Sequence, residues 1–319
     1  MNELRLSDFD EKGGWASNAR VSATLADFGS LSLSGSMSTP GFGSIEKKVS
    51  ERSRETVKQY DVSSSLELGK LLNEDLNIKV PMYVGYSEAI RTPQFNPLDP
   101  DILLKSVLPT LEPETRDSIK NVTQDYTRRK SINFSNVHKE KGQGKTKSHV
   151  YDVENLSTTY AYSEIYQRSM NIEYSKQKNY KGALTYNFSA SPKNIKPFEK
   201  SKALKSKYFA LIKDFNFYPY PKKYGFTTDV NRTYSELKNR NVTASDVILP
   251  PNYNKTFSMM RSYDLKYDIS KSLTLDFTAN NTARIFEPYG KIDTDEERDT
   301  IKHNFYTLGN TNNYRHNTN

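Results

Sequence analysis

The sequence has no cysteine, a single tryptophan and no long hydrophobic run. Without cysteine, the chain can form neither disulfides nor thiolate sites. Its longest apolar runs, such as Ile102–Leu104, are far shorter than the roughly 18 residues that a membrane-spanning helix needs. The opening Met1–Arg5 lacks the apolar segment of a secretory signal peptide. The protein is therefore either cytoplasmic or begins upstream of Met1, and we favour the second interpretation.

Aliphatic residues are also scarce, because only 35% of the chain is hydrophobic, yet aromatic residues reach 12% and include 22 tyrosines. Disordered chains are poor in aromatics, so disorder fits badly. A chain rich in Tyr, Ser, Asn and Thr suits strands with one apolar and one wet face. The net charge of +8 comes largely from lysines in the expected loops 139–147 and 193–207. We interpret it as solvated loop charge and predict no nucleic-acid partner, because the aromatics do not gather with the basic residues.

The strongest pattern is an alternation of apolar and polar residues from Phe257 to Ile269, which resumes from Leu273 to Ala279 after Ser270-Lys271. Period two is typical of strands, because successive side chains point to opposite faces. Arg261 interrupts this apolar face, so we expect it near a membrane interface or on a face that lipid does not wholly cover. The same alternation recurs at 21–25, 31–37, 60–68, 78–86, 156–162, 182–190 and 224–230.

The expected connections differ in length. Short turns are predicted near 27–29, 73–76, 176–179, 219–222 and 270–271, and longer links at 39–54, 89–125, 191–206 and 237–253, whereas 138–149 and 163–168 fit this alternation poorly. Short turns at one end and long loops at the other are typical of transmembrane barrels, with the short turns in the periplasm. The predicted fold is all-β: an antiparallel transmembrane β-barrel segment, seen as an open curved sheet of about twelve strands. The alternative is a soluble, basic β-sandwich, which also has period-two strands.

Short helices are expected in the long loops. Thr294 and Glu297 have the spacing of a capping box, and Gly309 can end that helix. Pro113 can open another helix that runs to about Gln124. We therefore expect residues 1–319 to belong to one large barrel, with loop inserts containing helical pieces at 89–125 and 287–319.

Catalytic and metal-binding signatures are missing. Gly142–Thr146 resembles part of a phosphate-binding loop, but Lys139 stands where that motif needs a glycine. The four histidines, at 138, 149, 303 and 316, lack metal-ligand spacing. The acidic run Asp8–Glu11 could bind a cation but is more simply solvated or paired with Lys12 or Arg5. We predict no enzyme activity, no cofactor and no metal.

Several blocks of sequence are far more specific than any generic motif. They are Asn2–Ala16, Ser36–Glu46, Val49–Glu55, Pro81–Ser87, Asn96–Asp101 and the region from Ala283 to Asp299. These blocks resemble the SprA family, also called Sov, over nearly the whole chain. The residues that we take as the family signature are Asn2, Glu3, Leu4, Arg5, Asp8, Phe9, Asp10, Gly13, Gly14, Trp15, Thr39, Pro40, Gly41, Phe42, Gly43, Glu51, Arg52, Ser53, Arg54, Asn96, Pro97, Asp99 and Pro100.

The resemblance implies an internal segment of a wide outer-membrane barrel, the translocon of the type IX secretion system. Such a protein exports folded cargo proteins for gliding motility, adhesion or digestion. The implied partners are outer-membrane lipid, the secreted cargo, a plug protein and a small partner barrel at a lateral opening. The implied location is the bacterial outer membrane at the cell surface. The resemblance assigns no gate or cargo-contact residue. The alternative to a translocon is another outer-membrane barrel, of the TonB-dependent receptor or lipopolysaccharide-transport type.

Overall fold

The computed structural model describes residues 13–48, 51–142, 149–199, 208, 210–242, 247–307 and 314–318. These residues form one large antiparallel sheet of twelve strands. The strands are β1 (Ala16–Leu25), β2 (Gly29–Ser38), β3 (Glu55–Glu67), β4 (Ile78–Lys79), β5 (Pro81–Pro93), β8 (Asp125–Lys139), β9 (Leu156–Arg168), β10 (Ile172–Ser189), β11 (Lys223–Asn239), β12 (Asn252–Asp268), β13 (Thr274–Arg284) and β14 (Tyr314–Thr318).

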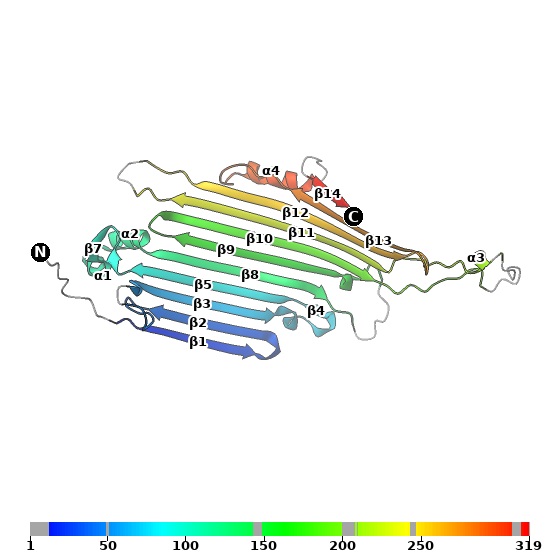
Figure 1. Ribbon diagram of the computed structural model, residues 1–319, viewed down its shortest axis with the longest axis horizontal. Helices are drawn as coiled ribbons and strands as arrows, with labels where there is room; N and C mark the ends of the chain where they lie inside the picture. The colour runs from blue at the N-terminus through cyan, green and yellow to red at the C-terminus, as the bar shows by residue number, and fades with distance from the viewer. Residues whose placement is uncertain are drawn as a thin grey trace.

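The order of the strands in the sheet follows their order in the chain, except that the short β4 pairs with β8 beside the main path. Figure 1 shows the long strands side by side in one layer, with β1 at one edge and β14 at the other. Among the described residues, β1 pairs only with β2 and β14 only with β13, so the sheet is open. The prediction of an all-β, antiparallel sheet of about twelve strands is confirmed at this level. A β-sandwich would need a second packed sheet, which the described part of the chain does not contain.

Helices occur only in the connections of the described residues. The 94–124 link holds a small sheet of β6 (Phe95–Asn96) and β7 (Asp99–Leu103), followed by α1 (Leu104–Val107), η5 (Leu108–Thr110) and α2 (Pro113–Thr123). The predicted helix from Pro113 is thereby confirmed. Further along, α3 spans Ala210–Lys213, and α4 spans Asp295–Tyr306. The predicted helix end at Gly309 lies outside the described residues, as do Asp8–Glu11 and most of Gly142–Thr146.

Two predicted interruptions are strands instead. Residues 163–168 complete β9, and residues 176–179 lie inside β10, which pairs with β9 on one side and β11 on the other. The cluster of Lys176, Gln177, Lys178 and Asn179 looks like a turn because all four side chains are polar. In the sheet, successive side chains alternate between its faces, and the backbone stays paired through this region. The tight turn falls at 169–171.

A further prediction was wrong around residue 210. The expected turns and links implied a strand between 207 and 218, but the described residues there form α3 and a single bridge between Ile195 and Phe217. The described residues between 190 and 222 therefore belong to one long connection. Phe215 and Phe217 pack with their ring centroids 6.1 Å apart, so the aromatic residues of this region stabilise a loop rather than a strand.

Long and short links occur at both ends of the sheet, contrary to the prediction. The end marked by the β1–β2 turn carries links 26–28, 68–80, 140–155, 190–222 and 269–273, and the opposite end carries 39–54, 94–124, 169–171, 240–251 and 285–313. Loop length therefore does not fix which end faces the cell exterior (Figure 1). We call the second end the signature end, because the described signature residues lie there.

The described residues form very little core. The buried hydrophobic side chains are Leu104 in the 94–124 link and Phe188, Met259, Ala283 and Ile285 on or beside the sheet. No helix of the described residues has both the length and the apolar character to cross a membrane. The apolar side chains of the sheet consequently lie on its surface, and their arrangement defines the candidate site.

Candidate functional site

The two faces of the sheet differ in chemistry. Partners across an antiparallel ladder point to the same side, so the registers connect side chains from strand to strand. Leu33 is opposite Val62, which is opposite Tyr86. Likewise Leu184 is opposite Thr228, and Phe226 is opposite Tyr263. These side chains share one face, which we call the apolar face.

The apolar face is largely uncovered in the described part of the chain. Leu33 is 41% exposed, Tyr160 46% and Phe277 42%. Tyr162 and Tyr180 pack with ring centroids 5.0 Å apart, and Phe226 and Tyr263 are 5.2 Å apart, so aromatic contacts tie neighbouring strands together. The apolar residues of this face are Val21, Leu31, Leu33, Val62, Leu66, Met82, Val84, Tyr86, Ile132, Phe134, Leu156, Tyr160, Tyr162, Tyr180, Leu184, Tyr186, Phe188, Tyr224, Phe226, Val230, Phe257, Met259, Tyr263, Leu265, Leu275 and Phe277.

The opposite face, which we call the polar face, is almost entirely hydrophilic. On β2 every second residue from Ser30 to Ser38 is a serine that points there. The register continues this chemistry across the sheet through small hydroxyl and amide side chains. Examples are Ser63, Ser65, Ser87, Ser131, Asn133, Ser157, Thr159, Ser163, Gln177, Asn179, Thr185, Asn187, Thr227, Asn231, Thr256, Ser258, Ser262, Thr278 and Asn280.

Arg261 lies on the apolar face, within a polar row that crosses it. Its ladder partners are Thr228 on β11 and Asn281 on β13. Met259 and Tyr263 flank it along β12, so the row interrupts an otherwise apolar stretch. The sequence predicted this interruption, and the register supplies the polar neighbours that the sequence alone did not identify.

A repeated tyrosine–glutamate pair marks one border of the apolar face. On β5, β9 and β11, a tyrosine hydroxyl donates to the glutamate two residues further along the same strand. The distances are 3.4 Å from Tyr86 to Glu88, 2.8 Å from Tyr162 to Glu164 and 3.1 Å from Tyr234 to Glu236. In each pair the glutamate lies nearer the signature end. Tyrosine is amphipathic, so such pairs suit the boundary between an apolar band and water. Sequence analysis missed this spacing.

Three of the signature blocks meet through hydrogen bonds at the signature end. Trp15 N–H donates to Thr39 Oγ1 at 2.8 Å, and Thr39 N–H donates to the Trp15 carbonyl at 2.9 Å. Gly41 N–H donates to the Ser53 carbonyl at 2.8 Å. The start of β1, the 39–54 link and the start of β3 are thereby joined.

Two glycines allow these segments to approach closely. A Cβ on Gly14 would overlap the Phe42 backbone nitrogen and lie 2.5 Å from the Pro40 carbonyl oxygen. A Cβ on Gly43 would lie 3.2 Å from Arg52 Cγ, so this position is tight but less constrained. Only glycine fits at position 14 without moving the backbone of the neighbouring link.

The other signature residues lie nearby or outside the described structure. Gln94 N–H donates to the Arg54 carbonyl at 2.8 Å, which sets the 94–124 link beside β3. In that link Asn96 is buried and its Oδ1 accepts from Leu98 N–H at 3.2 Å. Pro97 follows Asn96, and Asp99 and Pro100 begin β7. Glu51 N–H donates to the Lys48 carbonyl. The signature residues that lie outside the described residues are Asn2, Glu3, Leu4, Arg5, Asp8, Phe9 and Asp10.

Residues 285–307 fold back over the apolar face as a flap. Ile285 N–H donates to the Phe257 carbonyl at 2.8 Å, and Lys255 Nζ donates to the Pro288 carbonyl at 2.8 Å. The ring of Phe305, on α4, stacks on Phe257 at 5.9 Å. This flap contributes Ile285 to the small cluster with Met259 and Ala283. The sequence predicted the helix but not where it packs.

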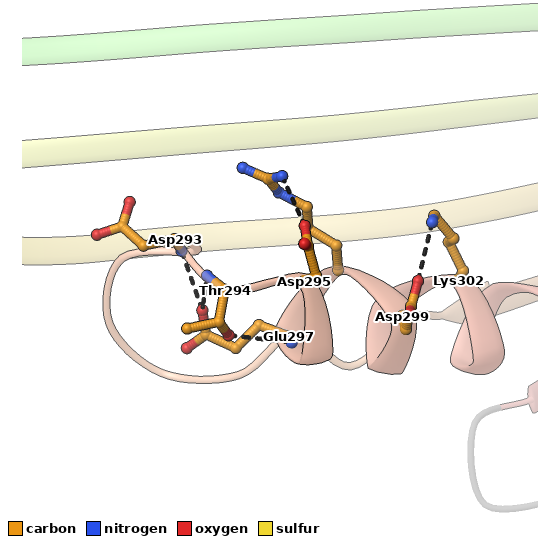
Figure 2. A network of polar contacts seen from close by, with 7 residues as sticks. Asp293, Thr294, Asp295, Glu297, Asp299 and Lys302 are labelled. Atoms are coloured by element: carbon orange, nitrogen blue, oxygen red, sulfur yellow. Dashed lines mark hydrogen bonds and ion pairs between the residues drawn. The ribbon is translucent and has the colours of Figure 1, made fainter.

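The capping box that starts α4 is confirmed (Figure 2). Glu297 N–H donates to Thr294 Oγ1 at 3.3 Å, while the Glu297 carboxylate accepts from the backbone N–H groups of Thr294 and Asp293 at 3.1 and 3.0 Å. These hydrogen bonds lower the pKa of Glu297, the bond from Thr294 first. Further along the helix, hydrogen bonding to Asp299 raises the pKa of Lys302.

The described residues contain no cluster of three or more histidine or carboxylate side chains that could hold a metal ion. His138 Nδ1 lies 2.7 Å from the Asn136 carbonyl, and His149 lies 3.8 Å from Asp152. These two histidines are therefore engaged locally. The described residues form an apolar face and a polar face on opposite sides of the sheet. The signature loops meet at one end of the sheet, and the flap covers part of the apolar face.

Comparison with protein families adds one match. Residues 1–108 match the family model described as "motility related/secretion protein", SprA_N. The matched segment includes the signature residues from Asn2 to Pro100 and the strands β1 to β5. A comparison with curated proteins gave no match.

Proposed function

We propose that the chain, whose residues 1–108 match the SprA_N family model, forms part of the wall of the outer-membrane translocon of a type IX secretion system. In this role the sheet is a segment of a wide barrel. The barrel would carry folded proteins to the cell surface for gliding motility or secretion. No reaction is catalysed, and no cofactor is needed.

The observation that carries the proposal is the exposure of the apolar face in a protein with almost no core. A soluble monomer rarely leaves a large apolar surface uncovered, because burying such area is worth roughly 25 cal/mol per Å². Outward-facing lipid contacts would cover the apolar face along its length. The alternation of lipid-facing and water-facing residues along each strand is the pattern of transmembrane barrels.

The polar face suits the lumen of such a barrel. Serine, threonine and asparagine side chains present hydroxyl and amide groups that remain hydrated. A folded cargo protein that slides past this surface meets few apolar groups that would hold it. The family resemblance adds a plug and a small partner barrel as partners, and the location follows as the outer membrane at the cell surface. Other outer-membrane barrels share this strand pattern, and the family match favours the translocon.

The faces can be tested with single cysteines, because the chain has none of its own. Leu184 and Thr185 are neighbours on β10, and the register assigns them to the apolar and polar faces respectively. In the protein in outer membranes, a hydrophilic maleimide should label Thr185→Cys and leave Leu184→Cys largely unlabelled. Oxygen dissolved in the lipid should relax a spin label at position 184 more strongly than a spin label at position 185.

The matched pair on β2, Ser32 and Leu33, repeats the comparison at the other side of the sheet. Equal labelling of both residues in each pair would show that water reaches both faces, and the wall proposal would then be wrong. Detergent solubilisation should make all four positions reactive, which controls for side chains that are simply hidden by protein.

A further inference from the structure

A groove of about 540 Å³ lies between the flap and the apolar face of β10 and β11. It is close to the signature end, where the tyrosine–glutamate pairs border the apolar face. Its lining is strongly basic, and we call it the basic groove. The cations that line it are Lys176 and Lys178 on β10, Arg232 on β11, and Lys291, Arg298 and Lys302 on the flap.

The flap cations are already paired, but weakly. Lys291 lies 3.1 Å from Asp293, Arg298 is 3.0 Å from Asp295, and Lys302 is 2.9 Å from Asp299, with all three basic side chains more than half exposed. Exposed ion pairs contribute little, so a stronger anion can compete for these cations. Figure 2 shows the Asp299–Lys302 contact on the helix.

The strand lysines supply the available charge. Across the ladders Lys176 is opposite Glu236 and Lys178 is opposite Glu164. Glu164 already accepts hydrogen bonds from Tyr162 and Arg128. Lys176 Nζ lies 5.0 Å from the centre of the Tyr174 ring. Two neighbouring lysines on one face of a strand repel each other, and an anion between them would relieve that repulsion.

Glu236 also lines the groove, but its carboxylate is committed elsewhere. Tyr174 and Tyr234 donate to its two oxygens at 2.8 and 3.1 Å, and the residue is buried. Its position fixes the two tyrosines that support Lys176 and the groove wall. The groove lining therefore holds six basic side chains and two acidic ones, Glu236 and Asp293. Arg232 and the three flap cations each have a carboxylate partner, so an incoming anion must compete with these partners or bind at the strand lysines.

The groove continues into the apolar face. Tyr180 lines it, and the next residues of β10 on the same face are Gly182 and Leu184. A Cβ on Gly182 would meet no atom within 4 Å, so the missing side chain leaves an open space between Tyr180 and Leu184, which we call the hollow. On β11, Arg232 is followed on the same face by Val230. A ligand with an anionic head in the groove could extend an apolar tail along this hollow.

We propose that the basic groove binds the phosphate of an anionic membrane lipid, whose acyl chains lie over Gly182 and Leu184. Basic pockets beside an apolar membrane-facing surface suit such headgroups. This inference rests on the proposed function, because it needs the apolar face to contact lipid. It assigns to the flap a role that a plain wall segment does not need, namely closing one side of a lipid site.

The test is lipid binding by the protein in detergent micelles. Dioleoyl phosphatidylglycerol is titrated, with dioleoyl phosphatidylcholine as the uncharged reference and inorganic phosphate as a competitor. The variant Lys176→Gln/Lys178→Gln should weaken phosphatidylglycerol binding by about tenfold or more. Lys181→Gln, which removes one charge from the polar face of the same strand, should leave binding unchanged. Lys178→Arg should retain binding, which guards against a loss caused by misfolding.

A second variant separates the two sources of phosphate. Gly182→Leu fills the hollow, so it should weaken phosphatidylglycerol binding and leave inorganic phosphate binding unaffected. Equal sensitivity of inorganic phosphate and lipid to the lysine variants, with no effect of Gly182→Leu, would assign the groove to free phosphate and overturn the lipid proposal. Equal losses in Lys181→Gln would mean a general charge effect and would also overturn it. The cysteine labelling of Leu184 and Thr185 tests the wall independently, so failure of one proposal is distinguishable from failure of the other.

Discussion

Arg232 on β11 and Glu287 on the flap form a two-pronged ion pair. Arg232 Nε lies 2.5 Å from Glu287 Oε1, and Nη2 lies 3.0 Å from Oε2. The Glu287 side chain is 3% exposed, and that of Arg232 is 30% exposed. Two parallel hydrogen bonds between charged groups fix orientation as well as distance. The pair therefore anchors the flap to the sheet.

Replacing Glu287 by glutamine should release the flap. The guanidinium of Arg232 would lose its charged partner while remaining largely covered, at a cost of about 2 kcal/mol. The population of opened flap should rise by more than tenfold. Trypsin cleavage after Lys291 and Arg298 measures this opening. Glu296→Gln, an exposed change on the same segment, is the matched control and should leave the rate unchanged. Identical cleavage in both variants would mean that the pair does not anchor the flap.

The capping box should make α4 sensitive to acid. Because the pKa of Glu297 is lowered in the folded chain, its ionised form stabilises the helix start above the unfolded carboxyl pKa of about 4.3. That stabilisation is lost as the pH falls through the lower folded value. Hydrogen exchange of residues 293–306, corrected for the intrinsic rate, should accelerate in this acid range. Glu297→Gln should abolish the pH dependence, and an acid response that persists in this variant would assign it to another group.

Gly14→Ala should disrupt the junction of the signature loops. The new methyl group would meet the backbone of Pro40 and Phe42, and forced overpacking costs about 1–3 kcal/mol. Faster hydrogen exchange at the amides of Thr39 and Gly41 would report the loss. Gly13→Ala is the matched control, because a Cβ there meets no atom within 4 Å. The steric explanation fails if the two variants behave alike.

Ser118 and Lys271 lie at opposite ends of the sheet, in α2 and in the β12–β13 turn respectively, and both are exposed. A wall that spans the membrane must place them on opposite sides. On intact cells, an impermeant maleimide should label only one of Ser118→Cys and Lys271→Cys. The labelled position identifies the end that faces the cell exterior. Labelling of both positions on intact cells would contradict a spanning wall.

The strands with a simple pattern could be predicted from the sequence. On β2, serine alternates with leucine, glycine and methionine, and that alternation fixes both the strand and its faces. The first half of β10 could not be predicted in this way, because Lys176 and Lys178 stand on the apolar face beside the flap. Their charge is compatible with a strand because the neighbouring strands set carboxylates opposite them, Glu236 opposite Lys176 and Glu164 opposite Lys178.

The candidate site also contains features that the local sequence predicts and features that it does not. Thr294 and Glu297 are three residues apart, so local chemistry predicts the cap. Arg232 and Glu287 are 55 residues apart, and no local pattern indicates that they meet. The signature residues were selected by resemblance, but the contact between Trp15 and Thr39 depends on β1 pairing with β2. The prediction of a short turn near 73–76 was wrong because the link there runs from 68 to 80. It contains two short helices, η3 (Leu68–Leu71) and η4 (Glu74–Leu76).

The chain-order arrangement of the strands also determines how the sheet can assemble. Apart from β4, each strand joins the one that precedes it along the path, so no strand has to insert between two that are already paired. Assembly can therefore proceed by adding strands one at a time at a growing edge. The entropy of closing each link depends only weakly on its length, and the 190–222 link costs only about 2 kcal/mol more than the 169–171 turn. A long loop can thus be inserted between neighbouring strands without changing the order in which they pair.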